Sequence, residues 1–294
     1  MKIKASFGER VFQVFNYIIL GLTAFVCLYP MWHVLMASFS DSAALTAHSG
    51  LLFWPIDFSL DAYRRVLSNQ NIWTGYLNTI KLLVMGVSTS MVMTILGAYV
   101  LSRKDFLLRR PIMLAITFTM FFSGGTIPTY LNIQELGLKG SLWGVVLPFC
   151  IATYNMIILR TSFESLPESL LEAARIDGAG QVACLTKIVL PLSKAIIAVN
   201  VLFYAVGMWN HYFKSMLYLS STELQPLQIY LRNILFAAEM VADSGGADSS
   251  SGLYLLSEKL KYAVIVFGML PILCIYPFLQ KYFVKGVMIG SIKG

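Results

Sequence analysis

Six long apolar runs limit what this chain can fold into. Each holds roughly 20 residues, the length that an α-helix needs to cross the hydrocarbon of a membrane at about 1.5 Å per residue. Loops and open sheet edges cannot satisfy their backbone polar groups in lipid, so we expect a helix from each run. The runs are approximately 11–39, 73–101, 111–131, 142–159, 192–219 and 260–283.

The balance of apolar and charged residues supports the same fold class. Apolar residues make up 57% of the 294-residue chain and charged residues 13%, whereas soluble domains are about half apolar and a quarter charged. The polar stretches between the runs are too short for a separate soluble domain. We therefore predict an all-α, polytopic membrane protein with six transmembrane helices in a single domain over residues 1–294.

The distribution of the basic residues predicts the orientation in the membrane. They lie at alternate ends of the runs rather than in one patch, which is typical of orientation signals and argues against nucleic-acid binding. With the N-terminus inside, the inner segments are 1–10, 102–110, 160–191 and the tail from 281. Together with Lys194, they hold 14 of the 22 basic residues and only six of the 15 acidic ones. We expect both termini to be cytoplasmic, the loops 40–71 and 220–259 to lie outside, and the first run to be a retained span.

The polar segment 160–191 has the pattern of a rigid helix–turn–helix. Ser165, Pro167 and Glu168 form a helix-start signal, because the hydroxyl and the carboxylate can satisfy free amides and proline tolerates the first turn. Gly178 can take the left-handed conformation that ends a helix, and residues 179–190 are expected to form a second short helix that Pro191 stops. Three- and four-residue spacing predicts one apolar, partly small face on the first helix. Its members are Leu166, Leu170, Ala173, Ala174 and Asp177.

This segment resembles the cytoplasmic loop of the membrane-spanning subunits of ABC importers. That loop carries E-A-A, three residues, G, nine residues and I-x-L-P. Every fixed position is present here, as Glu172, Ala173, Ala174, Gly178, Ile188, Leu190 and Pro191. In that family the loop docks into a cleft of the ATP-hydrolysing subunit, so the resemblance implies that these seven residues and Asp177 form an ATPase-docking site. A plain amphipathic connector is the alternative.

Further stretches are similar to carbohydrate-importer permeases of the maltose type. They are the I-P-x-Y pattern at 127–130, the Trp209-Asn210 pair and the ending from residue 281. Aromatic rings stack on sugar faces, while amides and hydroxyls bind sugar hydroxyls. We therefore predict a substrate pathway near Asn78, Tyr204, Trp209 and Asn210. An aromatic belt at the membrane boundary would use similar residues and stays open as the alternative.

The sequence carries no motif for chemistry of its own. It lacks the G-x-x-x-x-G-K-[ST] phosphate loop, Ser/His/Asp and Cys/His arrangements, and metal-ligand spacing. We expect no catalytic residue, no metal and no cofactor in this chain. ATP and Mg²⁺ would be held by partner subunits.

The resemblance implies a type I ABC importer permease fold and a subunit that translocates carbohydrate by alternating access. Its expected partners are two ATP-binding-cassette ATPase subunits, a second homologous permease, an extracytoplasmic solute-binding protein and the bilayer of the cytoplasmic (inner) membrane. The ending looks closest to permeases for polysaccharide fragments, including acidic ones. An importer of a non-sugar solute is the alternative, and a channel or membrane enzyme without an ATPase is a more distant one.

Overall fold

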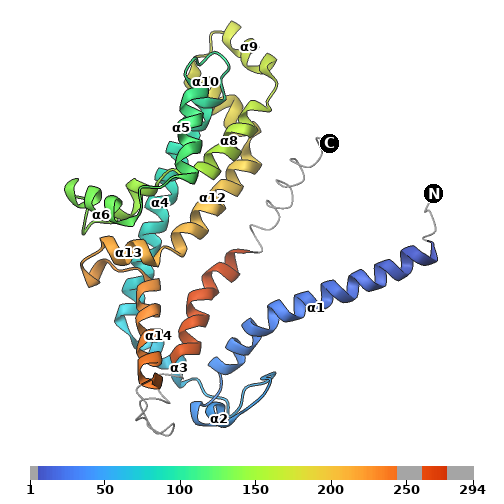
Figure 1. Cartoon of the computed structure of the whole chain (residues 1–294), viewed down its shortest axis with the longest axis vertical. Coiled ribbons are helices and arrows are strands. Elements are labelled where there is room, and N and C mark those ends of the chain that lie inside the picture. Colours follow the sequence, from blue (N-terminus) through green and yellow to red (C-terminus); the bar gives the residue numbers. More distant parts are fainter. Residues whose placement is uncertain (1–5, 244–259, 277–294) are drawn as a thin grey trace. The chain divides into compact units, whose positions relative to one another are not determined.

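The computed structural model describes residues 6–243 and 260–276, and every regular element in these ranges is helical. This confirms the all-α class for the described part of the chain (Figure 1). The chain divides into two compact units. Unit 1 comprises Met1–Gln70 and Leu231–Met269, and unit 2 comprises Asn71–Tyr230 and Leu270–Gly294.

Unit 1 is built on α1 (Phe7–Ser38), an apolar helix of 32 residues. Its surface is exposed along most of its length, and its buried residues lie at the C-terminal end. There Met36 and Ala37 form an apolar cluster with Leu52. Two short helices follow, α2 (Ser42–Ala47) and α3 (Asp61–Ser68). The predicted outer loop 40–71 is therefore partly helical.

Unit 2 is arranged along α4 (Gln70–Ser102), a helix of 33 residues with buried side chains along its whole length. Three bent helix pairs accompany it. They are α5 (Arg109–Phe121) with α6 (Thr126–Glu135), α7 (Leu142–Val146) with α8 (Thr153–Glu164), and the segment Gln181–Leu192 with α12 (Lys194–Trp209). Unit 2 also contains α13 (Tyr212–Tyr218), whereas α14 (Leu227–Asp243) and the helix Leu260–Tyr276 each have residues in both units.

The bends explain why several predicted runs do not form straight helices. The third run breaks after Phe121 and turns by 116°, with Gly125 at a φ of 86°. A residue without a side chain tolerates this left-handed conformation, which accounts for the bend at the pair Gly124 and Gly125. The fifth run is also broken, because α12 ends at Trp209 and α13 begins at Tyr212.

The lengths and compositions of these helices give a range for the number of membrane crossings. By length and composition, α1 and α4 can each cross a membrane alone, and up to five crossings result if each bent pair counts as one. The sixth predicted run begins as the helix Leu260–Tyr276, and its residues 277–283 lie outside the described part. Six crossings therefore stay a prediction.

A buried apolar cluster in unit 2 holds the helix ends around the polar segment 160–191. It joins the C-terminal part of α4 to α8, to α9 (Glu168–Ile176) and to the helical turns that follow. Its buried members are Ala98, Tyr99, Leu101, Met156, Leu159, Phe163, Leu171, Cys184, Leu185 and Val189. This cluster ties the polar segment to α4 and α8 as one packed body.

Candidate functional site

The segment from α9 to α11 (Leu190–Leu192) forms a helical elbow, which lies at the top end of unit 2 in Figure 1. Gly178 takes a φ of 81° two residues after the end of α9, following the C-cap residue Asp177. Its amide donates to the Arg175 carbonyl at 3.0 Å, and the Ala179 amide donates to the Ala174 carbonyl at 2.8 Å. These two bonds satisfy carbonyls at the end of the helix. They require Gly178 to be in the left-handed conformation. The predicted turn at Gly178 is confirmed.

The predicted capping of the first elbow helix by Ser165 and Glu168 was wrong. Ser165 ends α8, and its hydroxyl donates to the Ser162 carbonyl at 2.8 Å instead of capping α9. The Glu168 carboxylate accepts a hydrogen bond from Lys104. The position before α9 is held by Pro167, without a side-chain hydrogen bond.

The predicted stop at Pro191 lies one residue before the observed end of the second helix. The second helix begins as α10 (Gln181–Cys184), continues through a π-helical turn at Leu185–Val189 and passes Pro191 to end at Leu192. Proline inside a helix lacks the amide for a backbone hydrogen bond and its ring clashes with the preceding turn, which is consistent with a helix end at this point. The chain then bends by 85° at the break before α12.

The predicted apolar face of α9 divides between the core and the surface. Leu166 and Ala174 pack against the buried cluster, whereas Leu170, Ala173 and Asp177 are exposed. Leu171, which the spacing did not include, is the buried leucine of α9.

The eight predicted docking residues divide in the same way. Glu172, Ala173, Asp177, Gly178 and Pro191 are exposed, and the other three are partly buried. Those three are Ala174, Ile188 and Leu190, and all pack against the buried cluster. The motif therefore combines a surface with the residues that support it.

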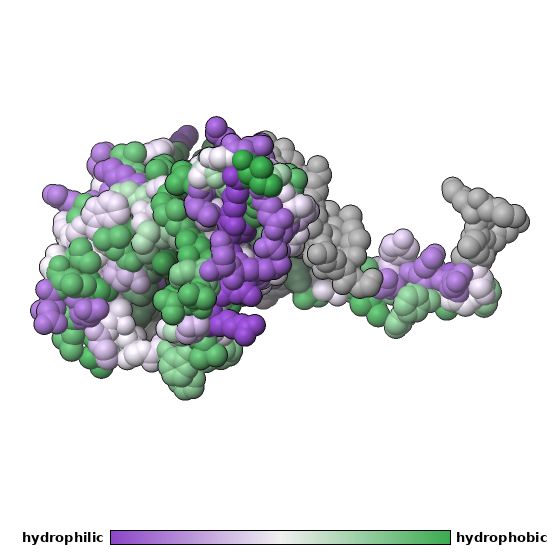
Figure 2. Space-filling model, turned by 90° about the horizontal axis from the view of Figure 1, so that it is seen from above, coloured by the Kyte–Doolittle hydropathy of each residue, from purple (hydrophilic) through white to green (hydrophobic). Residues whose placement is uncertain are grey.

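Two exposed apolar residues on the elbow were missed by the sequence reasoning. Ile176 is 86% exposed and Val182 is 75% exposed, on either side of the Gly178 turn. Figure 2, which looks down on this end, shows hydrophilic residues gathered there with hydrophobic patches between them. These two side chains add apolar area to a largely polar surface. The sequence feature that could have identified them is the presence of β-branched residues close to a turn glycine in a polar loop.

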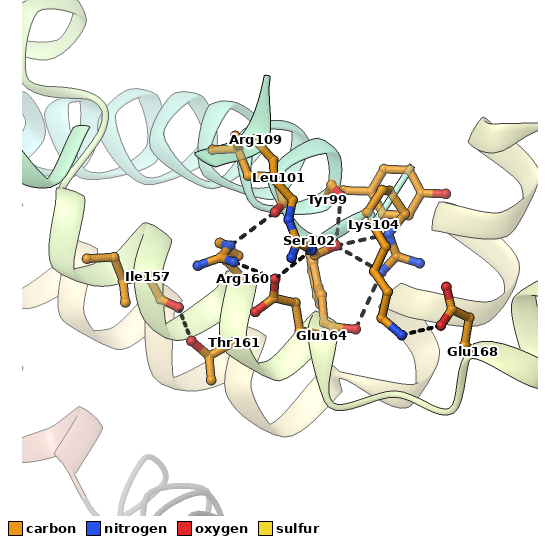
Figure 3. A network of polar contacts seen from close by, with 12 residues as sticks. Tyr99, Leu101, Ser102, Lys104, Arg109, Ile157, Arg160, Thr161, Glu164 and Glu168 are labelled. Carbon is orange, nitrogen blue, oxygen red and sulfur yellow. Dashed lines mark hydrogen bonds and ion pairs between the residues drawn. The ribbon is translucent and has the colours of Figure 1, made fainter. Parts of the chain in front are cut away.

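A short turn after α4, residues 103–108, holds both ends of α9. Lys104 lies 2.5 Å from the Glu168 carboxylate at the start of α9 (Figure 3), and Asp105 lies 3.1 Å from Arg175 in its last turn. The Tyr99 hydroxyl donates to the Gln181 side chain of α10 at 2.8 Å. The elbow is thus attached to α4 by polar contacts as well as by the apolar cluster.

The four pathway candidates are used in different contacts. Asn78 is buried and donates to the carbonyls of Glu223 and Gln225 at 2.6 and 3.2 Å, and its neighbour Thr79 accepts from the Leu227 amide at 2.9 Å. These bonds tie α4 to the segment that leads into α14.

The other three candidates belong to the fifth predicted run. The Tyr204 hydroxyl lies 2.6 Å from the Thr94 hydroxyl and accepts from the Ala152 amide at 3.1 Å. Trp209 is buried and lines an apolar cavity of about 410 Å³ between α4, α12 and residues 271–276. Asn210 is exposed and donates to the carbonyl of Val206. A pathway role for these four residues stays a prediction.

Lys214 is a charged residue of the fifth predicted run that the sequence reasoning passed over. It is only partly exposed, and its ammonium lies 3.3 Å from His211 Nε2 and 3.8 Å from the centre of the Phe149 ring. No carboxylate of the described residues pairs with it. Ionisable residues at membrane depth usually mark a functional site, and this rule was the available signal.

The described residues include no group of three histidine, cysteine or acidic side chains that could hold a metal ion.

No family model matches the chain. It is 41% identical to a polygalacturonan/rhamnogalacturonan transport system permease protein of Bacillus subtilis over 97% of this chain and 99% of that protein. The B. subtilis protein LplC is 39% identical over 97% and 96%. A bacterial ABC transporter involved in the import of the acidic polysaccharide alginate has a solved chain with 36% identity and a TM-score of 0.85, over 96% of this chain and 100% of that one.

These matches extend over nearly the whole chain, so they cover both the helices and the elbow. In such transporters the ATPase is a separate subunit, and the permease has no ATP site of its own. The chain therefore belongs to the family of permease subunits of carbohydrate ABC importers.

Proposed function

We propose that this chain carries fragments of acidic polysaccharides across the cytoplasmic membrane, driven by two ATPase subunits that its elbow contacts. The observation that supports this most directly is the elbow itself. Its Gly178 turn leaves Ile176 and Val182 exposed, while Leu171 and Cys184 fix the opposite side in a core shared with α4 and α8. A partner that binds the exposed side therefore moves those helices with it.

The proposed mechanism is alternating access. Closure of the two ATPase subunits on ATP would push two elbows together, and the packed cluster would transmit this movement into the membrane. Nucleotide shifts the equilibrium only because it prefers one conformation over the other. The chain has one elbow, so a second permease supplies the other, and a solute-binding protein delivers the cargo. Both termini and the elbow would lie in the cytoplasm, and the six helices form one domain with outer loops at 40–71 and 220–259.

The proposed cargo rests on the relatives and on one side chain. Two of the similar proteins serve the transport of polygalacturonan or rhamnogalacturonan and of alginate. In this chain Lys214 is a half-buried cation without a carboxylate partner among the described residues. Burial of an unpaired charge is costly, and a cargo carboxylate would offset that cost.

Reconstituted transporter can test this proposal. The complete complex in proteoliposomes, given its solute-binding protein and ATP, should import trigalacturonate and hydrolyse ATP faster in its presence. Lys214→Met should reduce trigalacturonate import more than maltotriose import, and Lys139→Met, which changes an exposed lysine, is the matched control. Stimulation by a non-sugar solute, with neither trisaccharide active, would contradict the proposal.

A further inference from the structure

A groove of about 700 Å³ runs along α5 beside α8. Arginines line the end nearest the elbow, and apolar residues with one threonine line the rest. The arginines are Arg109, Arg110 and Arg160, and the other lining residues are Met113, Leu114, Thr117, Phe118, Phe121 and Phe122. Since α5 has 13 residues, the groove extends over roughly 20 Å of helix.

The arginine end carries an excess of positive charge that is held in place. The Glu164 carboxylate lies 2.5 Å from Arg160 and 3.6 Å from Arg109, so that one acid serves two guanidinium groups (Figure 3). Arg160 also donates to the Leu101 carbonyl at 3.0 Å. Arg110 has no ion pair within the described residues. Three cations around one carboxylate leave room for further anionic partners.

The rest of the groove presents flat apolar faces. The rings of Phe118 and Phe122 are stacked with their centres 4.3 Å apart. Phe121 is 74% exposed, and α5 has no buried residue. Rings of this kind pack on the C–H faces of sugars, and the Thr117 hydroxyl offers a hydrogen-bonding group between them.

We propose that this groove is a binding subsite for acidic oligosaccharide during transport, in which the arginines pair with cargo carboxylates and the phenylalanines pack against sugar rings. This inference rests on the proposed function, since it places the same cargo on this chain. The planar guanidinium matches a carboxylate in a two-point geometry. A uronate oligomer repeats its carboxylate from ring to ring and so fits several arginines. An ordinary phosphodiester lipid headgroup offers a single negative charge.

The test uses the complete transporter in nanodiscs and trigalacturonate that carries a photoreactive diazirine. Labelling should map to residues 109–122, and unlabelled trigalacturonate should compete for it better than maltotriose. Arg110→Gln should raise the KM for trigalacturonate import about tenfold, because a charge-assisted hydrogen bond is lost, and change the KM for maltotriose little. Arg110→Lys should give an intermediate value. Arg65→Gln, which removes an exposed arginine of α3, is the matched control.

Several results would overturn the inference. One is equal behaviour of Arg110→Gln and Arg65→Gln while the unaltered transporter imports trigalacturonate, and in that case the proposed function stands. A second is labelling of 109–122 by a photoreactive phosphatidylglycerol that trigalacturonate does not displace. A third is cross-linking of Phe118→Cys to the second permease in place of sugar labelling. If the unaltered complex imports neither trisaccharide, the proposed function and the subsite fail together.

Discussion

The elbow depends on a single backbone conformation at Gly178. Its φ of 81° is one that residues with a Cβ atom rarely adopt, and a Cβ placed there would meet no atom within 4 Å. A side chain at position 178 would therefore be disfavoured by the backbone conformation and not by contacts with neighbouring atoms. Gly180, two residues later, has an ordinary φ of −71° and equally open surroundings. The two glycines form a natural pair for comparison.

Gly178→Val should weaken the elbow, whereas Gly180→Val should not. A β-branched residue in the left-handed region costs roughly 1–2 kcal/mol, which lowers the population of the intact turn about five- to thirtyfold. We expect reduced co-purification of the ATPase and reduced transport, with normal amounts of chain in the membrane. Equal ATPase retention by the two variants would show that the turn does not govern docking.

Ile176 and Val182 are expected to supply most of the apolar contact with the ATPase. Burial of such a side chain contributes about 1.5–3 kcal/mol, so Ile176→Ser or Val182→Ser should weaken ATPase binding at least about tenfold in a titration of the solubilised permease complex. Leu60→Ser changes an apolar residue of unit 1 that is 41% exposed and serves as the control. Unchanged affinity in both elbow variants would place the docking surface elsewhere.

At the scale of elements, α9 is held by charges that suit its own polarity. Glu168 lies in its first turn and Arg175 in its last, where each favours the helix dipole, and Lys104 and Asp105 provide the opposite charges. Exposed pairs are individually weak. Two of them at opposite ends nevertheless fix the direction of the helix relative to the turn at 103–108.

Reversal of one ion pair should test this arrangement. Asp105→Arg and Arg175→Asp each place like charges together and should lower ATP-dependent transport a few-fold, while the double variant should recover most of the loss. Raised salt should reduce the differences because it screens exposed charges. Double-variant transport no better than that of the worse single variant would contradict a role for the pair.

The errors of sequence reasoning lie at the ends of elements. Local rules assigned Glu168 to a helix cap, but Lys104, 64 residues earlier, binds it instead. They assigned Pro191 to a helix stop, and the helix ends one residue later at Leu192, after a π turn that the local rules did not predict. The Lys104–Glu168 contact is tertiary and the π turn is a rare helical geometry, and neither leaves a mark in the local pattern. Gly178 and Gly125 were predictable, because their conformations are a local requirement.

At the scale of the whole molecule, the apolar runs predicted the helices and the motif predicted the family. The membrane orientation follows from charge placement and stays a prediction. The division of the elbow into exposed and supporting residues could not be read from the sequence. It depends on how α9 is rotated against the buried cluster, and a face assigned from spacing misplaced Leu170 and Leu171.

Cysteine labelling can test the orientation. In a chain whose four natural cysteines are replaced, Ser169→Cys on the elbow should react with a membrane-impermeant maleimide only after the membrane is opened. Ser59→Cys in the loop 40–71 should react in intact cells or spheroplasts. Both positions lie outside the predicted membrane runs. Reaction of Ser169→Cys in intact spheroplasts would place the elbow outside and overturn the proposed function.

The seam between α4 and the segment before α14 has a consequence for how such permeases diversify. The side chains of Asn78 and Thr79 form hydrogen bonds with main-chain atoms of residues 223, 225 and 227, not with their side chains. The side chains of Glu223 and Gln225 can therefore change without loss of these hydrogen bonds, whereas the Leu227 side chain is fully buried. Substitutions at these two positions would leave the contact between α4 and this segment in place.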